Sequence, residues 1–265
     1  MLPPKDFFDL SKFKHRPFFE EDKPVWESLK RIKPYIREVI EPNVSKIRNR
    51  GDVLLRTVVL YQDQVLDEGY ELEMGDPAKG KFKVIYRGEV LVGAAVIYAG
   101  VSLFDDQIYI GEGTVIEPGA LIKGPTIIGG GTEVRQGAYI RGDCLIGDRC
   151  VVGHTTEIKT GIMLDGAKAG HFAYIGDSIL GNEVNLGAGT KLANLKIIAS
   201  SVSLKIEGKK YDTGLRKFGA ILGDRVETGC NSVTSPGTIL GPRSLVYPNT
   251  TVRSGYHKPG IRIKG

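Results

Sequence analysis

The sequence has few cysteines, one tryptophan and no long apolar run. Its 265 residues include Cys144, Cys150 and Cys230, none in a Cys-x-x-Cys pair. Three such cysteines exclude a disulfide framework and favour a reducing, cytoplasmic compartment. The longest uncharged run, residues 90–104, is shorter than the roughly 20 apolar residues of a membrane span. The first residues show no charged segment followed by an apolar one, so no secretory signal is expected.

The sequence also lacks a large excess of charge of either sign. The 36 Lys and Arg residues are nearly balanced by 31 Asp and Glu residues, which leaves a formal net charge of +5. This excess can help to hold a small anion, but it is too weak and diffuse to indicate a nucleic-acid-binding protein.

Glycine is scarce in the first third of the chain and abundant afterwards. Only four of the 35 glycines precede residue 88. The apolar residues between the later glycines argue against disorder, and no Gly-X-Y period indicates collagen. The remaining interpretation of the glycine-rich part is a repeat architecture with a turn every few residues.

The repeat has a period of six residues. Every sixth residue from Ile110 to Ile158 is Ile or Val, and the pattern resumes after two slips of one residue. This period fits a β-helix in which each hexapeptide forms one side and a turn, with the aliphatic residue inside. Residues 88–255 have room for roughly nine coils of about 4.8 Å each. The later ladder residues are Met163, Ala169, Ile175, Leu180, Leu186, Leu192, Leu222, Thr228, Thr234, Leu240, Val246 and Val252.

Residues 1–87 have a different, α+β character. Residues 24–40 show the apolar spacing of an amphipathic helix, in which Pro34 requires a kink or break. Residues 52–60 and 69–86 contain alternating stretches that predict strands, with a turn at residues 76–80. We expect residues 1–87 to form a small cap on the first coil of a β-helix domain of residues 88–265.

Polar residues interrupt the repeat between Arg141 and Asn194. The three blocks are 157–159 (Glu-Ile-Lys), 167–177 (Ala-Lys-Ala-Gly-His-Phe-Ala-Tyr-Ile-Gly-Asp) and 185–190 (Asn-Leu-Gly-Ala-Gly-Thr). Here the sequence resembles the C-terminal acetyltransferase domain of the bifunctional N-acetylglucosamine-1-phosphate uridyltransferase / glucosamine-1-phosphate acetyltransferase family. The resemblance covers roughly residues 110–250 and implies a left-handed β-helix of the hexapeptide-repeat acyltransferases.

The resemblance also implies roles for individual residues. His171 is then the general base, and the backbone N–H of Ala188 lies near the thioester of acetyl-CoA. Arg141, Lys159 and Lys217 hold the sugar phosphate, and Glu157 borders the amine. The remaining implied contacts are Tyr174, Asn185 and Asn194 to the sugar, and Ala188, Cys230 and Pro248 to coenzyme A.

These residue types suit the implied chemistry. An imidazole can take the proton that an attacking amine must lose, and Lys and Arg bind phosphate. Acetyl transfer requires no metal, and the sequence shows no zinc-ligand spacing, Walker loop or dinucleotide fingerprint. His154, Cys144 and Cys150 are interpreted as structural.

The chain departs from the family at several places. Residues 1–87 are too short for a uridyltransferase domain, so pyrophosphorylase activity is not expected. Residues 195–216 form a longer loop than the family has, with a hairpin expected around residues 203–210. Cys230 and Pro248 replace small residues along the coenzyme A groove.

The sequence therefore predicts an acetyl-CoA-dependent N-acetyltransferase for an amino-sugar 1-phosphate such as glucosamine-1-phosphate. The resemblance implies a homotrimer with sites between subunits. Two alternatives stay open: an acyltransferase with another acyl donor or sugar acceptor, and a non-catalytic β-helix that binds a sugar phosphate or assists a partner. A metal-dependent, carbonic anhydrase-like β-helix is disfavoured because it needs three His ligands and only His154 and His171 lie in the core region of the β-helix.

Overall fold

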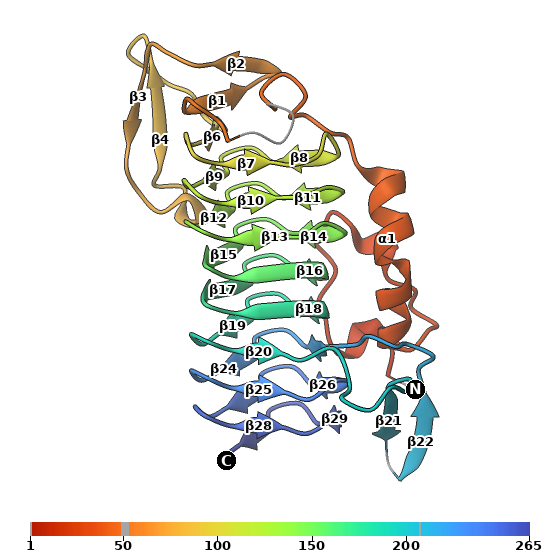
Figure 1. Cartoon of the computed structure of the whole chain (residues 1–265). Helices are drawn as coiled ribbons and strands as arrows, with labels where there is room; N and C mark the ends of the chain where they lie inside the picture. The colour runs from red at the N-terminus through yellow and green to blue at the C-terminus, as the bar shows by residue number, and fades with distance from the viewer. Residues whose placement is uncertain (1, 49–52, 207) are drawn as a thin grey trace.

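The chain folds into a three-sided parallel β-helix with additions at one end and along one side (Figure 1). The computed structural model describes residues 2–48, 53–206 and 208–265. Strands of successive coils pair in parallel, one coil above the next. Eight complete coils are followed by the first strand of a ninth. The predicted β-helix of hexapeptide repeats is confirmed.

Each coil contributes to three faces. The first face contains β6 (Ala95–Ile97), β9 (Val115–Ile116), β12 (Glu133–Val134), β15 (Val151–His154), β17 (Lys168–His171), β19 (Asn185–Leu186), β24 (Glu227–Thr228), β27 (Leu245–Val246) and β30 (Arg262–Ile263). The second contains β7 (Ser102–Leu103), β10 (Leu121–Ile122), β13 (Tyr139–Ile140), the first halves of β16 (Glu157–Met163) and β18 (Tyr174–Leu180), β20 (Lys191–Leu192), β25 (Val233–Thr234) and β28 (Thr251–Val252). The third contains β8 (Ile108–Ile110), β11 (Thr126–Ile128), β14 (Cys144–Ile146), the second halves of β16 and β18, β23 (Ala220–Leu222), β26 (Thr238–Leu240) and β29 (Gly255–His257).

The six-residue ladder fills the interior of the coils, as predicted. Its members from Ile110 to Val252 are at most 5% exposed. Where Thr228 replaces an aliphatic residue, its hydroxyl lies 2.8 Å from that of Thr190 and satisfies the polar group inside the coil.

The two register slips have a local cause. β16 and β18 each continue from the second face onto the third without a break. At the corner they pass through Thr160 and Asp177, whose φ angles are positive. At these two corners the ladder advances by five residues instead of six, from Ile158 to Met163 and from Ile175 to Leu180.

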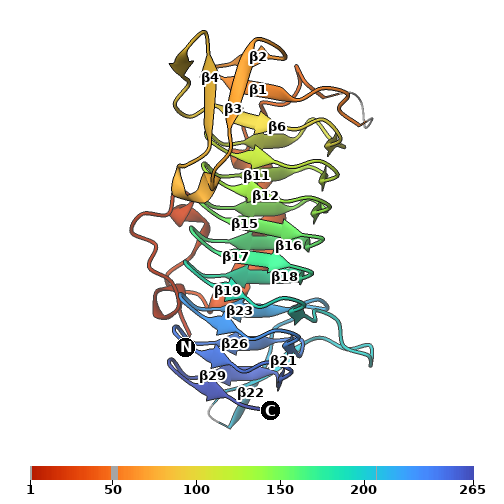
Figure 2. The same cartoon turned by 90° about the vertical axis from the view of Figure 1, so that its left-hand side faces the viewer.

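Residues 53–90 cover the N-terminal end of the β-helix. β1 (Val58–Tyr61) pairs antiparallel with β6 and with β2 (Gln64–Leu66). The sheet of β3 (Tyr70–Glu73), β4 (Lys83–Tyr86) and β5 (Glu89–Val90) packs over the first face, where it buries Val96 and Val115 (Figure 2). A short 3-10 turn, η4 (Pro77–Lys79), stands at the predicted turn. Residue 52, the start of the first predicted strand, lies outside the described residues.

Residues 2–40 do not cover the end of the β-helix, which corrects our expectation for that part of the cap. They run along the third face as three short turns, η1 (Pro4–Asp6), η2 (Arg16–Phe18) and η3 (Val25–Glu27), followed by α1 (Ser28–Val39). Their aromatic and aliphatic side chains form a second core with the outward residues of that face. The helix continues through Pro34 to Val39, so the predicted break is absent. The outward residues buried in this way are Ile127, Leu145, Ile162, Ile179, Ile221 and Ile239.

The insertion contains the predicted hairpin. β21 (Ser203–Ile206) pairs antiparallel with β22 (Lys209–Asp212). Val202 and Leu204 join the second core, and the Tyr211 ring lies 6.3 Å from that of Trp26. The third face is thus covered by both the N-terminal arm and the insertion, whereas no described element of the chain covers the second face.

Candidate functional site

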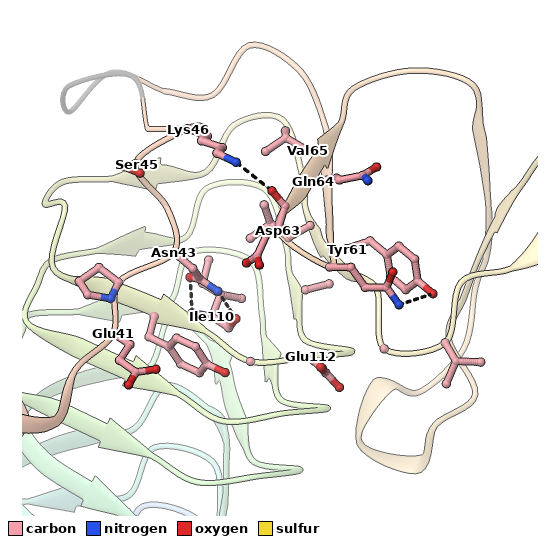
Figure 3. A pocket seen from close by; sticks show the side chains of 18 residues that line it. Glu41, Asn43, Ser45, Lys46, Tyr61, Asp63, Gln64, Val65, Ile110 and Glu112 are labelled. Carbon is pink, nitrogen blue, oxygen red and sulfur yellow. Dashed lines mark hydrogen bonds between the residues drawn. The ribbon is translucent and has the colours of Figure 1, made fainter.

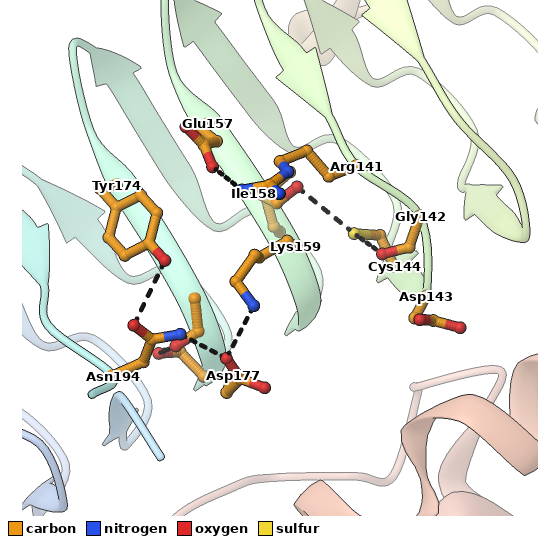
Figure 4. Close-up of polar contacts among 12 residues, drawn as sticks. Arg141, Gly142, Asp143, Cys144, Glu157, Ile158, Lys159, Tyr174, Asp177 and Asn194 are labelled. Carbon is orange, nitrogen blue, oxygen red and sulfur yellow. Dashed lines mark hydrogen bonds and ion pairs between the residues drawn. The ribbon is translucent and has the colours of Figure 1, made fainter. Parts of the chain in front are cut away.

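Five of the predicted substrate residues gather on the open second face (Figure 4). Glu157 and Tyr174 are direct neighbours across β16 and β18, because the parallel register places them at the same position of successive coils. Arg141 follows β13, one coil toward the N-terminus, and Lys159 lies next to Gly176 in the register. Successive coils therefore bring these side chains together, although up to 53 positions separate them in the sequence.

Arg141 and Glu157 form an ion pair on this face. Nη1 of Arg141 lies 2.7 Å from Oε1 of Glu157. The hydrogen bond that Arg141 donates to Glu157 raises the pKa of Arg141 further above its ordinary value. The Arg141 side chain is 43% exposed, so its remaining donors can meet an anion from solvent.

A second network surrounds Asp177. Lys159 Nζ lies 3.2 Å from Oδ2 of Asp177, and both side chains are less than a fifth exposed. Asn194 donates through Nδ2 to the same carboxylate and accepts from the Tyr174 hydroxyl at 3.3 Å. Burial raises the pKa of Tyr174 above its ordinary value, so this hydroxyl keeps its proton and can donate. Asp177 therefore fixes Lys159 and Asn194 in place.

The sequence analysis gave Asp177 no role of its own. One signal was available, because Asp177 lies where the ladder shortens to five residues between Ile175 and Leu180. A polar residue at such a corner points away from the interior ladder and is free to contact a neighbouring coil.

Lys217 returns to this site from the far end of the insertion. A β-bridge joins Leu195 to Lys217, and the Phe218 N–H donates to the Asn194 carbonyl. The insertion therefore leaves the coil and rejoins it at nearly the same point. Lys217 is exposed, and among the described side chains no carboxylate forms an ion pair with it.

His171, Ala188, Cys230 and Pro248 lie along the corner between the first and second faces. Backbone hydrogen bonds connect successive coils there, from Gly189 N to His171 O, from Asn231 N to Ala188 O and from Asn249 N to Cys230 O. The predicted general base and the predicted coenzyme contacts therefore form one column that descends toward the C-terminal end.

The His171 ring is exposed and belongs to this column. The His171 ring lies with its centre 6.1 Å from that of the Phe172 ring, and Phe172 is itself 54% exposed. His154 stands one coil above in the same register, where its Nδ1 lies 2.9 Å from the Gln136 carbonyl oxygen. His154 thus has a backbone partner, whereas the His171 imidazole is open to a ligand.

The structure does not bring all predicted residues together in one chain. Within the described chain no hydrogen bond, ion pair or ring contact joins His171 to the Arg141 or Asp177 groups. Asn185 lies on the first face in register with Lys168 and Glu227, apart from Tyr174.

The cysteines differ in accessibility. Cys144 and Cys150 are buried, and burial raises the pKa of each thiol to about 12. Neither can supply a thiolate at neutral pH. Cys230 is exposed on the column of His171, Ala188, Cys230 and Pro248. Across residues 2–48, 53–206 and 208–265, no group of three or more His, Cys, Asp or Glu side chains is arranged to hold a metal ion.

A large hollow lies away from these residues. It has a volume of about 730 Å³ and lies at the N-terminal end of the β-helix, between the β1–β2 hairpin and residues 41–46 (Figure 3). Glu41, Asp63 and Glu112 are among its lining residues, and none of the predicted site residues is. The predicted residues Arg141, Glu157, Lys159, Tyr174 and Asn194 thus lie on an open face of the β-helix, away from this hollow.

Comparisons with known proteins match the central coils. A family model described as the GMPPB C-terminal domain matches residues 122–208. The bifunctional sugar-1-phosphate nucleotidylyltransferase/acetyltransferase of Sulfurisphaera tokodaii is 38% identical over 101 residues, which cover 38% of this chain and 25% of that protein. The bifunctional protein GlmU of Methanococcus vannielii is 38% identical over 113 residues, covering 43% of this chain and 27% of the relative.

The resemblance to the acetyltransferase domain of this bifunctional family is confirmed. The chain spans about a quarter of the length of these curated relatives. Among solved structures, UDP-N-acetylglucosamine acyltransferase from Campylobacter jejuni aligns over 60% of this chain and 68% of its own, with 16% identity and a TM-score of 0.31. No described helix is long and apolar enough to cross a membrane.

Proposed function

We propose that this protein is an acetyl-CoA-dependent N-acetyltransferase that acts on an amino-sugar 1-phosphate such as glucosamine-1-phosphate. The observation that carries the proposal is the pairing of two sets of groups. Arg141 and Lys159 supply cations on the open second face, and the exposed Lys217 rejoins the coil beside Leu195. The adjoining corner presents the exposed His171. A phosphate monoester needs the first set, and an amine nucleophile needs the second.

The reaction follows from these groups. Arg141, Lys159 and Lys217 bind the phosphate, while Tyr174 and Asn194 bind sugar hydroxyls. His171 accepts a proton as the amine nitrogen bonds to the thioester carbon. The backbone N–H of Ala188 stabilises the oxyanion of the tetrahedral intermediate. The C–S bond then breaks, the amide forms, and the thiolate of coenzyme A takes up a proton.

Acetyl-CoA would lie along the corner column. Ala188, Cys230 and Pro248 present small or apolar surfaces below His171, so the pantetheine arm would run toward the C-terminal end. The acetyl transfer itself needs no metal. We place the activity in the cytoplasm, where acetyl-CoA and reduced thiols occur together.

The site would be completed in a homotrimer. His171 does not contact the Arg141 and Asp177 groups within one chain, and Asn185 lies on another face. The third face is covered by the N-terminal arm, whereas the second face and the C-terminal half of the first are uncovered by the chain's own elements. Contact between copies through these faces would bring His171 and Asn185 toward a partner's cations.

One assay tests the activity. The full chain is mixed with acetyl-CoA and glucosamine-1-phosphate, and release of free thiol is followed. His171→Ala is expected to lower kcat by roughly 10²–10⁴-fold, while the matched His154→Ala variant retains activity. Sedimentation analysis is expected to show a trimer.

A binding module is the second candidate, and the separation of His171 from the cations within one chain favours it. No thiol release with several amino sugars, together with unchanged sugar-phosphate binding by His171→Ala, would establish that candidate. Equal turnover by His171→Ala and the parent protein would exclude His171 as the base.

A further inference from the structure

A line of cations and aromatic rings extends the second face beyond Arg141 toward the N-terminus. Phe104, Lys123, Arg141 and Lys159 occupy the same position of four successive coils. Backbone bonds from Phe104 N to Ile122 O, from Lys123 N to Ile140 O and from Arg141 N to Ile158 O establish this register. The three cations are therefore spaced by about one coil, or ~4.8 Å.

Lys123 differs from the other two cations in having no acidic partner. Arg141 is paired with Glu157, and Lys159 is paired with Asp177. Lys123 forms no ion pair with any described carboxylate. The Asp105 carboxylate lies near the neighbouring Gly124, but its Oδ1 accepts a hydrogen bond from the Gln107 N–H.

Lys123 is held between two aromatic rings. Its Nζ lies 5.1 Å from the centre of the Phe104 ring and 5.6 Å from that of Tyr139. The Arg141 guanidinium lies 5.7 Å from the same Tyr139 ring. The two cations thus lie by the same ring, and of the two only Arg141 has a carboxylate partner, Glu157. An anion that bridges Lys123 and Arg141 would offset the repulsion between them.

The outer end of this line is apolar and open. Phe104 is 53% exposed, and Val53 bridges to Ser102 at the N-terminal edge of the strand that precedes it. An exposed aromatic ring one coil beyond an unpaired cation suits a planar base attached to a phosphate, because every base can stack on a ring.

We propose that the acceptor is an amino sugar joined to a nucleoside by a diphosphate, and that Phe104, Lys123 and Tyr139 hold its nucleotide part. This inference rests on the proposed acetyl transfer and replaces the free sugar 1-phosphate as acceptor by its nucleotide-linked form. The sugar would lie by Tyr174 and Asn194, its phosphate between Lys159 and Arg141, the second phosphate between Arg141 and Lys123, and the base on Phe104.

Binding measurements test the proposed nucleotide site of Phe104, Lys123 and Tyr139 without relying on turnover. The probes are UDP, GDP, UMP and glucosamine-1-phosphate, titrated calorimetrically into the full chain without acetyl-CoA. UDP and GDP are expected to bind at least tenfold more tightly than glucosamine-1-phosphate. Lys123→Ala is expected to remove that difference and to change the Kd of glucosamine-1-phosphate less than twofold. Phe104→Ala is expected to weaken UDP, GDP and UMP together.

The matched control is Lys14→Ala. Lys14 makes a similar contact with the Tyr109 ring at 5.7 Å, on the third face, so its removal should leave every Kd unchanged. The proposal is overturned if Lys123→Ala leaves diphosphate binding unchanged or weakens all ligands equally.

Thiol release separates this proposal from the proposed function. With UDP-glucosamine as acceptor, Lys123→Ala should raise the acceptor KM at least tenfold and leave the KM of acetyl-CoA unaltered. A rise in the KM of acetyl-CoA instead would assign the strip to the coenzyme and overturn the proposal. Diphosphate binding that depends on Lys123, without any turnover, would refute the acetyltransferase and support the nucleotide site of Phe104, Lys123 and Tyr139. Turnover of glucosamine-1-phosphate that does not depend on Lys123 would support the acetyltransferase and refute the proposed nucleotide site.

Discussion

Arg141 and Glu157 form an ion pair across two adjacent coils, with Nη1 of Arg141 2.7 Å from Oε1 of Glu157. The guanidinium proposed to bind phosphate is thus partly neutralised before any ligand arrives. A phosphate must compete with this carboxylate, so the pair tunes affinity as well as position.

Glu157→Gln is expected to strengthen binding of glucosamine-1-phosphate. An exposed pair is worth ~0.5–1 kcal/mol, so the Kd should fall roughly two- to fivefold. Calorimetry without acetyl-CoA measures this change apart from catalysis. Glu133→Gln is the control, because it frees Arg135 from a similar 2.9 Å pair away from the Arg141 and Asp177 groups. An unchanged or larger Kd in Glu157→Gln would contradict the competition.

Gly176→Ala is expected to disrupt the site. A Cβ at this position would lie 2.7 Å from both Nδ2 of Asn194 and the Tyr174 hydroxyl oxygen, so these two groups must move. Overpacking of this kind costs about 1–3 kcal/mol, and sugar-phosphate binding should weaken at least tenfold.

Gly170→Ala provides the comparison, since its Cβ would meet nothing closer than Nη1 of Arg135 at 3.9 Å. Calorimetric Kd values and urea unfolding of both variants measure the effect. Wild-type affinity in Gly176→Ala would show that the Tyr174–Asn194 pair does not contact the ligand.

His15 is expected to make the stability of the N-terminal arm depend on pH. Burial against the third face lowers the pKa of His15 to about 4, and the Tyr35 hydroxyl lies 3.0 Å from its Nδ1. An unfolded histidine titrates near 6.5. Between these values the unfolded chain binds the additional proton, so stability is full above about pH 6.5 and is lost as the pH falls toward 4.

The matched variant is His15→Gln, which cannot titrate. Urea unfolding at several pH values should show a smaller loss between pH 6.5 and 4 than in the parent protein. Parallel curves for the two proteins would rule out a contribution from His15.

Ile32→Ala is expected to loosen α1 from the β-helix. Ile32 is fully buried in the second core, and removing such a side chain costs about 2–4 kcal/mol. Urea unfolding measures the change, with the exposed Glu38→Ala on the same helix as control. Lys33 of this helix lies with its Nζ 3.3 Å from Oδ2 of Asp143 beside the site, so Ile32→Ala should also weaken sugar-phosphate binding. An unaltered unfolding midpoint would show that the N-terminal arm does not stabilise the β-helix.

Much of the site was predictable because its residues repeat with the coil. Arg141, Glu157, Lys159 and Tyr174 belong to one uninterrupted stretch, so parallel stacking of equal coils places them on one face. The partners of Asp177 and the separation of His171 were not predictable from the residues alone, although the five-residue spacing marked the position of Asp177. Both depend on how a five-residue side turns the corner and on which face each coil then presents.

The sequence by itself determined the β-helix, its interior ladder and the resemblance of its central coils to an acetyltransferase domain. These follow from a local six-residue period that every coil repeats, and from a contiguous polar block. Only the tertiary structure decided that residues 2–40 cover the third face and that Lys217 returns to Asn194 across the insertion. Such contacts join residues that are distant in the sequence. They depend on which apolar surfaces become buried together, and no periodic pattern in the sequence specifies this.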